Sequence, residues 1–174
     1  MMINPRNLLV TAAAVLALSM PGFSQDLTRL ERQVRHEIIM LPYLSLFDSI
    51  AFKVEDGTVT LQGYVTRPTL KRGAERVVAN IEGVQEVDNQ IEVLPVSPND
   101  DRIRQAVARA IYYHPSFTRY SFQAVPPIHI VVKNGDVTLE GYVATKSEKN
   151  IANIQANGVA GVFSVTNNLM IDKN

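Results

Sequence analysis

The chain has 174 residues, of which 46 % are hydrophobic and 20 % charged, and it contains no cysteine. This composition is typical of a globular protein and excludes the disordered, fibrous and disulfide-stapled classes. Lysine plus arginine and aspartate plus glutamate number 17 each, so the net charge gives no bulk attraction to nucleic acid.

The first 24 residues have the pattern of a secretory signal peptide. Arg6 precedes a run of apolar and weakly polar residues at 8–20, and Pro21-Gly22 and Ser24 follow it. A helix of that length spans about 20 Å. The hydrocarbon core of a bilayer is about 30 Å thick and needs roughly 20 helical residues to cross it. We therefore expect cleavage after Ser24, with an uncleaved anchor as the alternative. Because the chain lacks a lipoprotein cysteine, we expect a soluble periplasmic or secreted protein.

Nearly the same heptapeptide occurs twice, as VTLQGYV at 59–65 and VTLEGYV at 137–143. The match extends in both directions without a gap, from Gly57 with Gly135 to Ile91 with Leu169, and farther upstream residues 30–42 align with 103–115. The second copy then carries five extra residues before its first predicted strand. The repeat therefore covers a whole folding unit.

These features predict the domain organisation. We expect a signal peptide over 1–24, a first domain over 25–94, a proline-rich linker over 95–99 and a second domain over 100–174. Units of about 70 residues are marginally stable alone. We therefore expect the two domains to pack against each other.

Each copy begins with a predicted amphipathic helix. Apolar residues recur there at spacings of three and four: Leu30, Val34, Ile38 and Leu41 in the first copy, and Ile103, Val107, Ala110 and Ile111 in the second. Residues 99–101 are the N-cap candidates of the second helix.

A β-hairpin follows in each copy. The predicted strands are 51–54 and 58–65 around Asp56-Gly57, and 129–132 and 137–143 around Asn134-Gly135. In the heptapeptide the first, third, fifth and seventh residues share the core face. Gly63 lies on that face, and we expect it to permit a bulge or the close approach of a helix.

A second helix and a last strand complete each copy. Leu70, Ala74 and Val78 lie on the apolar stripe of the first copy's helix, and Thr145 with Glu148 predicts a capping box in the second. The predicted fold class is α+β, with two tandem α-β-β-α-β units. Each unit has a three-stranded mixed sheet with two helices on one face.

No residue pattern indicates catalysis. His36, His114 and His129 lack metal-ligand spacing, and no nucleophile elbow, phosphate loop or dinucleotide fingerprint is present. The acidic pairs at 55–56 and 100–101 suit turns and helix caps. We therefore expect a protein that is not an enzyme and needs no cofactor or metal.

The second copy is the basic half of the chain, because residues 25–94 carry a net charge of −3 and residues 95–174 carry +2. The outer surface of its first helix bears Arg102, Arg104, Arg109, Tyr112 and Tyr113, with Arg104 and Tyr113 at the flanks. Arginine and tyrosine suit the boundary between anionic headgroups and acyl chains. We predict peripheral contact with anionic phospholipid, and a solvated arginine-rich helix is the alternative.

A second surface is predicted around Ile154, which lies off the apolar stripe of its helix. We expect Ile154 to be buried between the domains or against a partner. Tyr64 and Tyr142 lie on the sheet face opposite the helices. Together these three residues would form the contact surface of a protein-interaction adaptor or a chaperone-like stress protein.

Each copy resembles a BON domain, the module named after bacterial osmotic-shock and nodulation proteins. The resemblance rests on VTLxGYV and on the closing segments GVQEVDNQIEV and GVFSVTNNLMI, and it covers nearly all of 27–172. It implies a periplasmic protein of two BON domains, a role in envelope maintenance or stress tolerance, phospholipid binding, and no catalytic residues. Some two-domain relatives are lipoproteins, from which this chain departs in lacking the cysteine.

Overall fold

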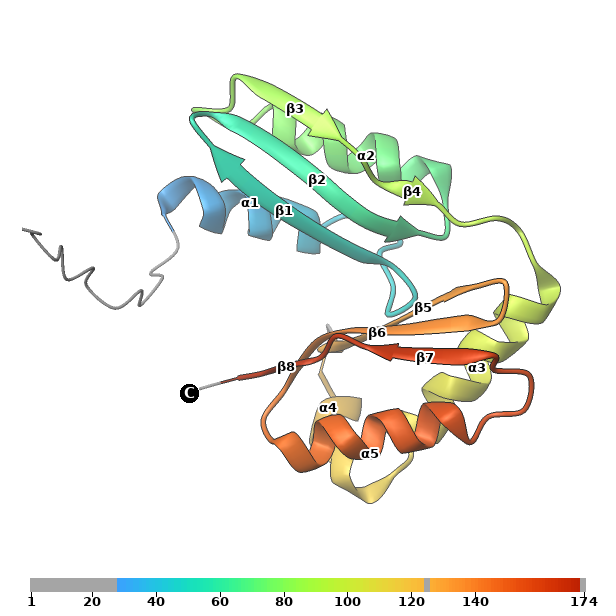
Figure 1. Cartoon of the computed structure of the whole chain (residues 1–174). Coiled ribbons are helices and arrows are strands. Elements are labelled where there is room, and N and C mark those ends of the chain that lie inside the picture. Colours follow the sequence, from blue (N-terminus) through green and yellow to red (C-terminus); the bar gives the residue numbers. More distant parts are fainter. Residues whose placement is uncertain (1–27, 124–125, 173–174) are drawn as a thin grey trace, which may run out of the picture.

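Two α+β domains follow each other along the chain (Figure 1) in a computed structural model that describes residues 28–123 and 126–172. The predicted signal peptide, 1–24, lies outside the described residues. Both domains have the predicted order of a helix, a hairpin, a second helix and a last strand. The predicted fold class is therefore confirmed.

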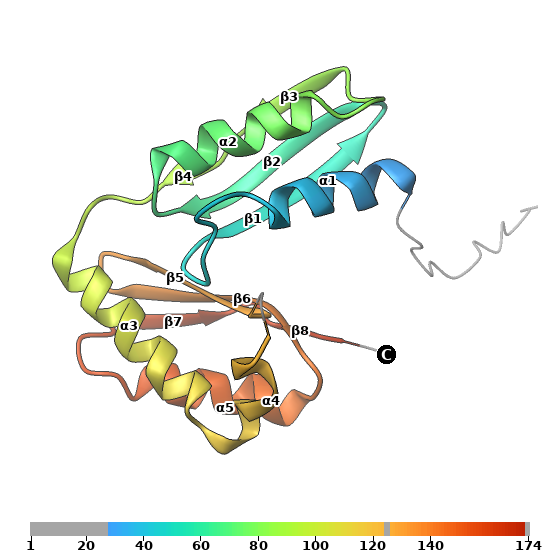
Figure 2. The ribbon, with the colours of Figure 1, turned by 180° about the vertical axis from the view of Figure 1, so that it is seen from behind.

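The first domain is built around one central strand. Its elements are α1 (Arg29–Ile39), β1 (Ser49–Glu55), β2 (Thr58–Val65), α2 (Pro68–Ala79), β3 (Glu86–Asn89) and β4 (Glu92–Val93). Strand β2 pairs antiparallel with β1 and parallel with both β3 and β4. These last two are halves of the single strand predicted from the sequence. Both helices cover the same face of the sheet (Figure 2).

The second domain repeats this plan and adds an insertion. Its elements are α3 (Pro98–Tyr112), a 3-10 turn (Pro115–Phe117), α4 (Thr118–Ser121), β5 (Ile128–Lys133), β6 (Asp136–Val143), α5 (Lys146–Asn157), β7 (Ser164–Asn167) and β8 (Met170–Ile171). The 3-10 turn and α4 occupy the region in which this copy is longer.

Helix α3 begins earlier than the sequence indicated. Ser97 is its N-cap, and the Ser97 side chain accepts a hydrogen bond from the backbone N–H of Asp100. The prediction of an N-cap within 99–101 is therefore wrong. The ring of Pro98 fixes its φ near the helical value, which suits the first residue of a helix. Residues 98 and 99, the end of the predicted linker, therefore belong to α3.

Each domain has its own apolar core between the helices and the sheet. Most residues of the predicted stripes are buried: Val34, Ile38 and Leu41 in α1 and just after it, Ile103, Val107 and Ile111 in α3, and Leu70, Ala74 and Val78 in α2. Leu30 and Ala110 are half-buried. The core face of the heptapeptide, Val59, Leu61 and Val65, has no exposed area. The alternation of the strands and the helical periodicity were therefore read correctly.

The repeated glycine has a reason that differs from the predicted one. Gly63 has φ +121, and a Cβ there would collide with the backbone carbonyl oxygen of Ser49 on the neighbouring strand. Gly141 has φ +107 and the same relation to Pro127. The glycine therefore serves the backbone of the hairpin and not the approach of a helix.

A compact loop, residues 43–48, leaves the first domain toward the second (Figure 1). The buried carboxylate of Asp48 organises it by accepting hydrogen bonds from the N–H and hydroxyl of Ser45, at 3.0 and 2.7 Å, and from those of Thr66, at 2.6 and 2.8 Å. Four donors on one carboxylate fix the path of the loop.

The predicted packing between domains is present, and this loop makes it. Leu46 and Phe47 pack against the apolar core of the second domain. The Leu46 carbonyl accepts a 2.7 Å hydrogen bond from the Ile130 N–H of β5. Lys133 and Glu92 form an ion pair between the domains at 2.6 Å.

Candidate functional site

The outer face of α3 is less open than its sequence suggests. Arg102 is exposed, but its guanidinium donates to the Ala160 carbonyl at 3.3 Å and to the Asn99 side-chain oxygen at 3.0 Å. Arg102 therefore joins the first turn of α3 to the segment that follows α5. Its charge still faces solvent, whereas its position is fixed by the domain.

Arg104 is not on the surface of the helix. Its side chain is only 4 % exposed, pairs with Asp101, and donates a 2.6 Å hydrogen bond from Nη2 to the Val132 carbonyl of β5. A guanidinium in this position cannot reach a membrane headgroup unless it breaks its hydrogen bond to β5. The expectation that Arg104 lies on an exposed flank is wrong.

Tyr112 also turns toward β5. Its hydroxyl donates to the Ile128 carbonyl at 2.7 Å and accepts from the Ile128 N–H at 3.2 Å. Burial raises the pKa of Tyr112 well above its usual range, and the hydrogen bond to Ile128 offsets only part of this shift. Tyr112 is therefore a neutral group that satisfies the backbone of an edge strand.

Two of the five predicted contact residues, Arg109 and Tyr113, remain exposed without a hydrogen bond or ion pair among the described residues, and Tyr113 is 82 % exposed. Phe122, which the sequence reading missed, is 85 % exposed at the end of α4. The Ser121 hydroxyl donates to the Tyr112 carbonyl at 2.8 Å, so Phe122 and Tyr113 belong to the same end of the domain. We call Arg109, Tyr113 and Phe122 the distal surface.

The neighbouring Arg119 already has an anionic partner. Glu148 is buried and pairs with Arg119, and it accepts hydrogen bonds from the Tyr120 hydroxyl and the Ala144 N–H, both at 2.9 Å. Glu148 also completes the predicted capping box with Thr145. This cluster ties the insertion to α5 and leaves the distal surface with Arg109 as its unpaired cation.

The three residues of the second predicted surface do not come together. Ile154 is 64 % exposed, so its predicted burial between the domains is wrong. Tyr142 is 41 % exposed. Tyr64 is half-buried in a shallow hollow that is also lined by Glu92 and by Glu140 of the second domain.

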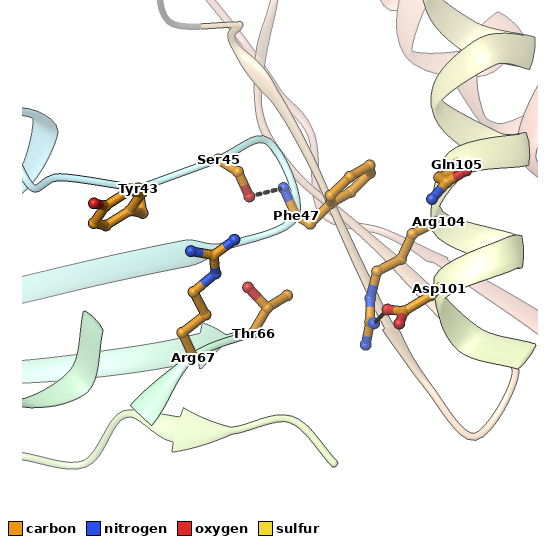
Figure 3. Close-up of a pocket in the computed structure, with 8 residues that line it drawn as sticks. All are labelled: Tyr43, Ser45, Phe47, Thr66, Arg67, Asp101, Arg104 and Gln105. Atoms are coloured by element: carbon orange, nitrogen blue, oxygen red, sulfur yellow. Dashed lines mark hydrogen bonds and ion pairs between the residues drawn. The ribbon is translucent and has the colours of Figure 1, made fainter. Parts of the chain in front are cut away.

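A pocket of about 490 Å³ lies between the two domains (Figure 3). It is lined by Tyr43, Ser45, Phe47, Thr66 and Arg67 of the first domain and by Asp101, Arg104 and Gln105 of α3. The sequence could not indicate this pocket, because its two walls belong to different repeats.

The histidines show no arrangement for metal binding. His114 Nδ1 accepts a 3.2 Å hydrogen bond from the Ser116 N–H and so caps the 3-10 turn. His129 lies at the domain contact, where burial lowers its pKa. Within 28–123 and 126–172, no group of three His, Asp or Glu side chains could hold a metal ion.

In the same part of the chain, no helix has the length and apolar character needed to span a membrane.

Comparison with protein families gives two matches to one model, described as the BON domain, over residues 26–95 and 99–173. No curated protein matches the chain. Among solved structures, CdsD, a structural protein of the type III secretion system of Chlamydia trachomatis, aligns at 14 % identity and a TM-score of 0.32, covering 84 % of this chain and 94 % of that one. A structure of the CdsD C-terminal domain aligns at 14 % identity and a TM-score of 0.30, covering 84 % and 99 %.

Proposed function

Because this chain belongs to the BON domain family and carries two such domains in tandem, we propose that it is a non-enzymatic protein of the cell envelope. It binds anionic phospholipid peripherally and contributes to envelope maintenance or stress tolerance. We further propose that residues 1–24 are a cleaved signal peptide and that the mature protein is periplasmic or secreted.

The distal surface of the second domain is the observation that supports lipid binding. Tyr113 and Phe122 expose more than four fifths of their area at one end of the domain. Arg109 lies one turn before Tyr113, the C-cap residue of α3, and has no anionic partner among the described residues. Exposed aromatic rings beside a free cation suit the headgroup region of a membrane.

The expected attraction is weak. One basic residue near an anionic membrane contributes about 1 kcal/mol to binding. Arg102 is held by Ala160 and Asn99, so it adds to this attraction only where that position brings it close to the membrane. The two aromatic rings therefore supply the rest of the binding energy by partial insertion. Such binding is reversible and salt-sensitive, as expected of a peripheral protein.

Vesicle flotation tests this function. The wild-type protein is expected to float with vesicles that contain phosphatidylglycerol and to stay behind with phosphatidylcholine alone. Tyr113→Ala/Phe122→Ala and Arg109→Glu should each lose most of the floating fraction. Phe163→Ala is the matched control, because Phe163 is 86 % exposed but lies in the loop between α5 and β7.

Equal flotation of wild type and both distal-surface variants would contradict the assignment of this surface. Absence of flotation at every salt concentration would contradict lipid binding itself. In that case the second candidate, a protein-interaction adaptor or chaperone-like stress protein, gains support. The exposed side chains of Ile154 and Tyr142 favour that candidate, and crosslinking from these two positions to a protein partner would test it.

A further inference from the structure

We propose that the pocket between the two domains binds a small organic anion, whose carboxylate or phosphate group lies between Arg67 and Arg104. The two arginines come from opposite walls of the pocket and from different domains (Figure 3). This site is separate from the distal surface and does not depend on lipid binding. It would be a function of the tandem arrangement, since one BON domain supplies only one wall.

The wall from the first domain holds Arg67 in place before any ligand arrives. The Arg67 guanidinium lies 5.3 Å from the centroid of the Tyr43 ring, which is a cation–π distance. Tyr43 has φ 69 and enters the loop that Asp48 fixes. Arg67 makes no ion pair or side-chain hydrogen bond with any described residue, so its donors are free.

The wall from the second domain offers a buried donor that lacks an acceptor. Two nitrogens of Arg104 are bound, Nη1 to Asp101 and Nη2 to the Val132 carbonyl. The third, Nε, is buried and has no hydrogen-bond partner. A buried donor left unpaired costs about 1–3 kcal/mol. Arg104 lines the pocket, and an acceptor there would remove that cost once the atoms that cover Nε move aside.

The side chains that line the pocket carry two positive charges and one negative charge, and the buried carboxylate of Asp48 lies close behind them. Asp101 is balanced by Arg104. Asp48 lies behind Ser45 and Thr66, and its two oxygens are occupied by four hydrogen bonds. Among the side chains that line the pocket, Arg67 is therefore the charge without an ionic partner, and an anion is the ligand that pairs with it.

The size and the apolar lining define the rest of the ligand. A volume of about 490 Å³ falls in the range of roughly 300–1,000 Å³ that is typical of small-molecule sites. The rings of Phe47 and Tyr43 provide an apolar surface. Gln105 adds an amide that makes no side-chain hydrogen bond with any described residue. These features fit a compact carboxylate or phosphate ester with a short carbon skeleton.

NMR of the arginine side chains tests the proposal directly. The probes are inorganic phosphate, citrate, glycerol 3-phosphate and a short-chain phosphatidylglycerol kept below its micellar concentration. The Nε–H resonance of Arg104 should shift saturably with at least one probe, because this donor gains an acceptor. Arg67→Gln should weaken that binding by about tenfold or more, since it removes a charge-assisted contact.

Arg76→Gln is the matched control, because Arg76 is an exposed arginine in the last turn of α2 and does not line the pocket. It should bind like the wild type. A response to soluble anions alone identifies a free metabolite-like ligand, and a response to the phosphatidylglycerol as well identifies a headgroup; both support the site. No saturable shift of Arg104 with any probe, or equal binding by Arg67→Gln, would overturn it. The Tyr113→Ala/Phe122→Ala variant should retain anion binding, which separates this result from the test of the distal surface.

Discussion

At the scale of single residues, Glu148 shows how one buried carboxylate holds an insertion in place. It is 8 % exposed and receives donors from α4, from the end of β6 and from the start of α5. Its role as the last partner of a capping box could be predicted from Thr145-x-x-Glu148. Its contacts with Arg119 and Tyr120 could not, because the first repeat has Leu70 at this position and lacks the insertion.

Glu148→Gln is expected to lower the free energy of unfolding by about 1–3 kcal/mol, because the amide removes the charge that its donors stabilise. Urea denaturation would measure the change. Glu82→Gln is the control, since Glu82 is exposed and its side chain makes no hydrogen bond or ion pair with any described residue. Equal stability of the two variants would contradict a structural role for the Glu148 charge.

His129 predicts a pH dependence of stability. Burial lowers its pKa, and the nearby Asp48 and Ser45 carbonyls and the carboxylates of Asp48 and Glu140 offset only part of this effect. A histidine whose pKa is lower in the folded than in the unfolded state favours unfolding as the pH falls below its unfolded pKa, about 6.5.

The melting temperature should therefore decrease as the pH is lowered from about 7 toward 5, and His129→Gln should reduce that decrease. Differential scanning calorimetry at several pH values would measure both. His36→Gln is the control, because His36 is exposed in the last turn of α1. A wild-type slope that His129→Gln leaves unchanged would assign the pH dependence to other groups.

At the scale of elements, the two hairpins differ in how their outer strands are closed. Ile128, Ile130 and Val132 of β5 are fully buried, and their outward backbone groups are bound by Tyr112, Leu46 and Arg104. The equivalent residues of β1, Ile50, Phe52 and Val54, are only half-buried. In the sequence alignment Glu31 and Ile39 stand in α1 where α3 has Arg104 and Tyr112.

This difference explains why the sequence placed Arg104 and Tyr112 on a surface. Helical periodicity separates an apolar stripe from the rest of the helix, but it does not reveal that a strand edge lies beside the stripe. The positions of α3, β5 and their packing were predictable from the repeat. The use of two polar side chains to close that edge depends on contacts 16 and 28 residues apart.

Tyr112→Phe should therefore destabilise the protein by about 1–3 kcal/mol, because both backbone groups of Ile128 lose their partner. Tyr113→Phe provides a control on the adjacent residue, whose hydroxyl is exposed, and it should change the unfolding free energy by less than about 0.5 kcal/mol. Chemical denaturation of the two variants under the same conditions would decide between an edge-closing role and a surface role for Tyr112.

At the scale of the whole molecule, the first domain contributes directly to the second. The loop over 43–48 supplies both an apolar contact and a backbone acceptor to β5, and its residues also line the pocket between the domains. The sequence indicated that two small domains would lean on each other. It could not indicate through which residues, because Leu46 and Phe47 lie outside the regular repeat.

The contact between Leu46 and β5 limits how far the second repeat can act as a separate module. The second repeat reads as a complete domain, yet one hydrogen-bond donor of its edge strand, the Ile130 N–H, is satisfied only by Leu46 of the preceding repeat. A fragment that starts at residue 95 would leave that donor open to pairing with other chains. The first repeat therefore protects an edge of the second, and duplication here has produced two units that are not interchangeable.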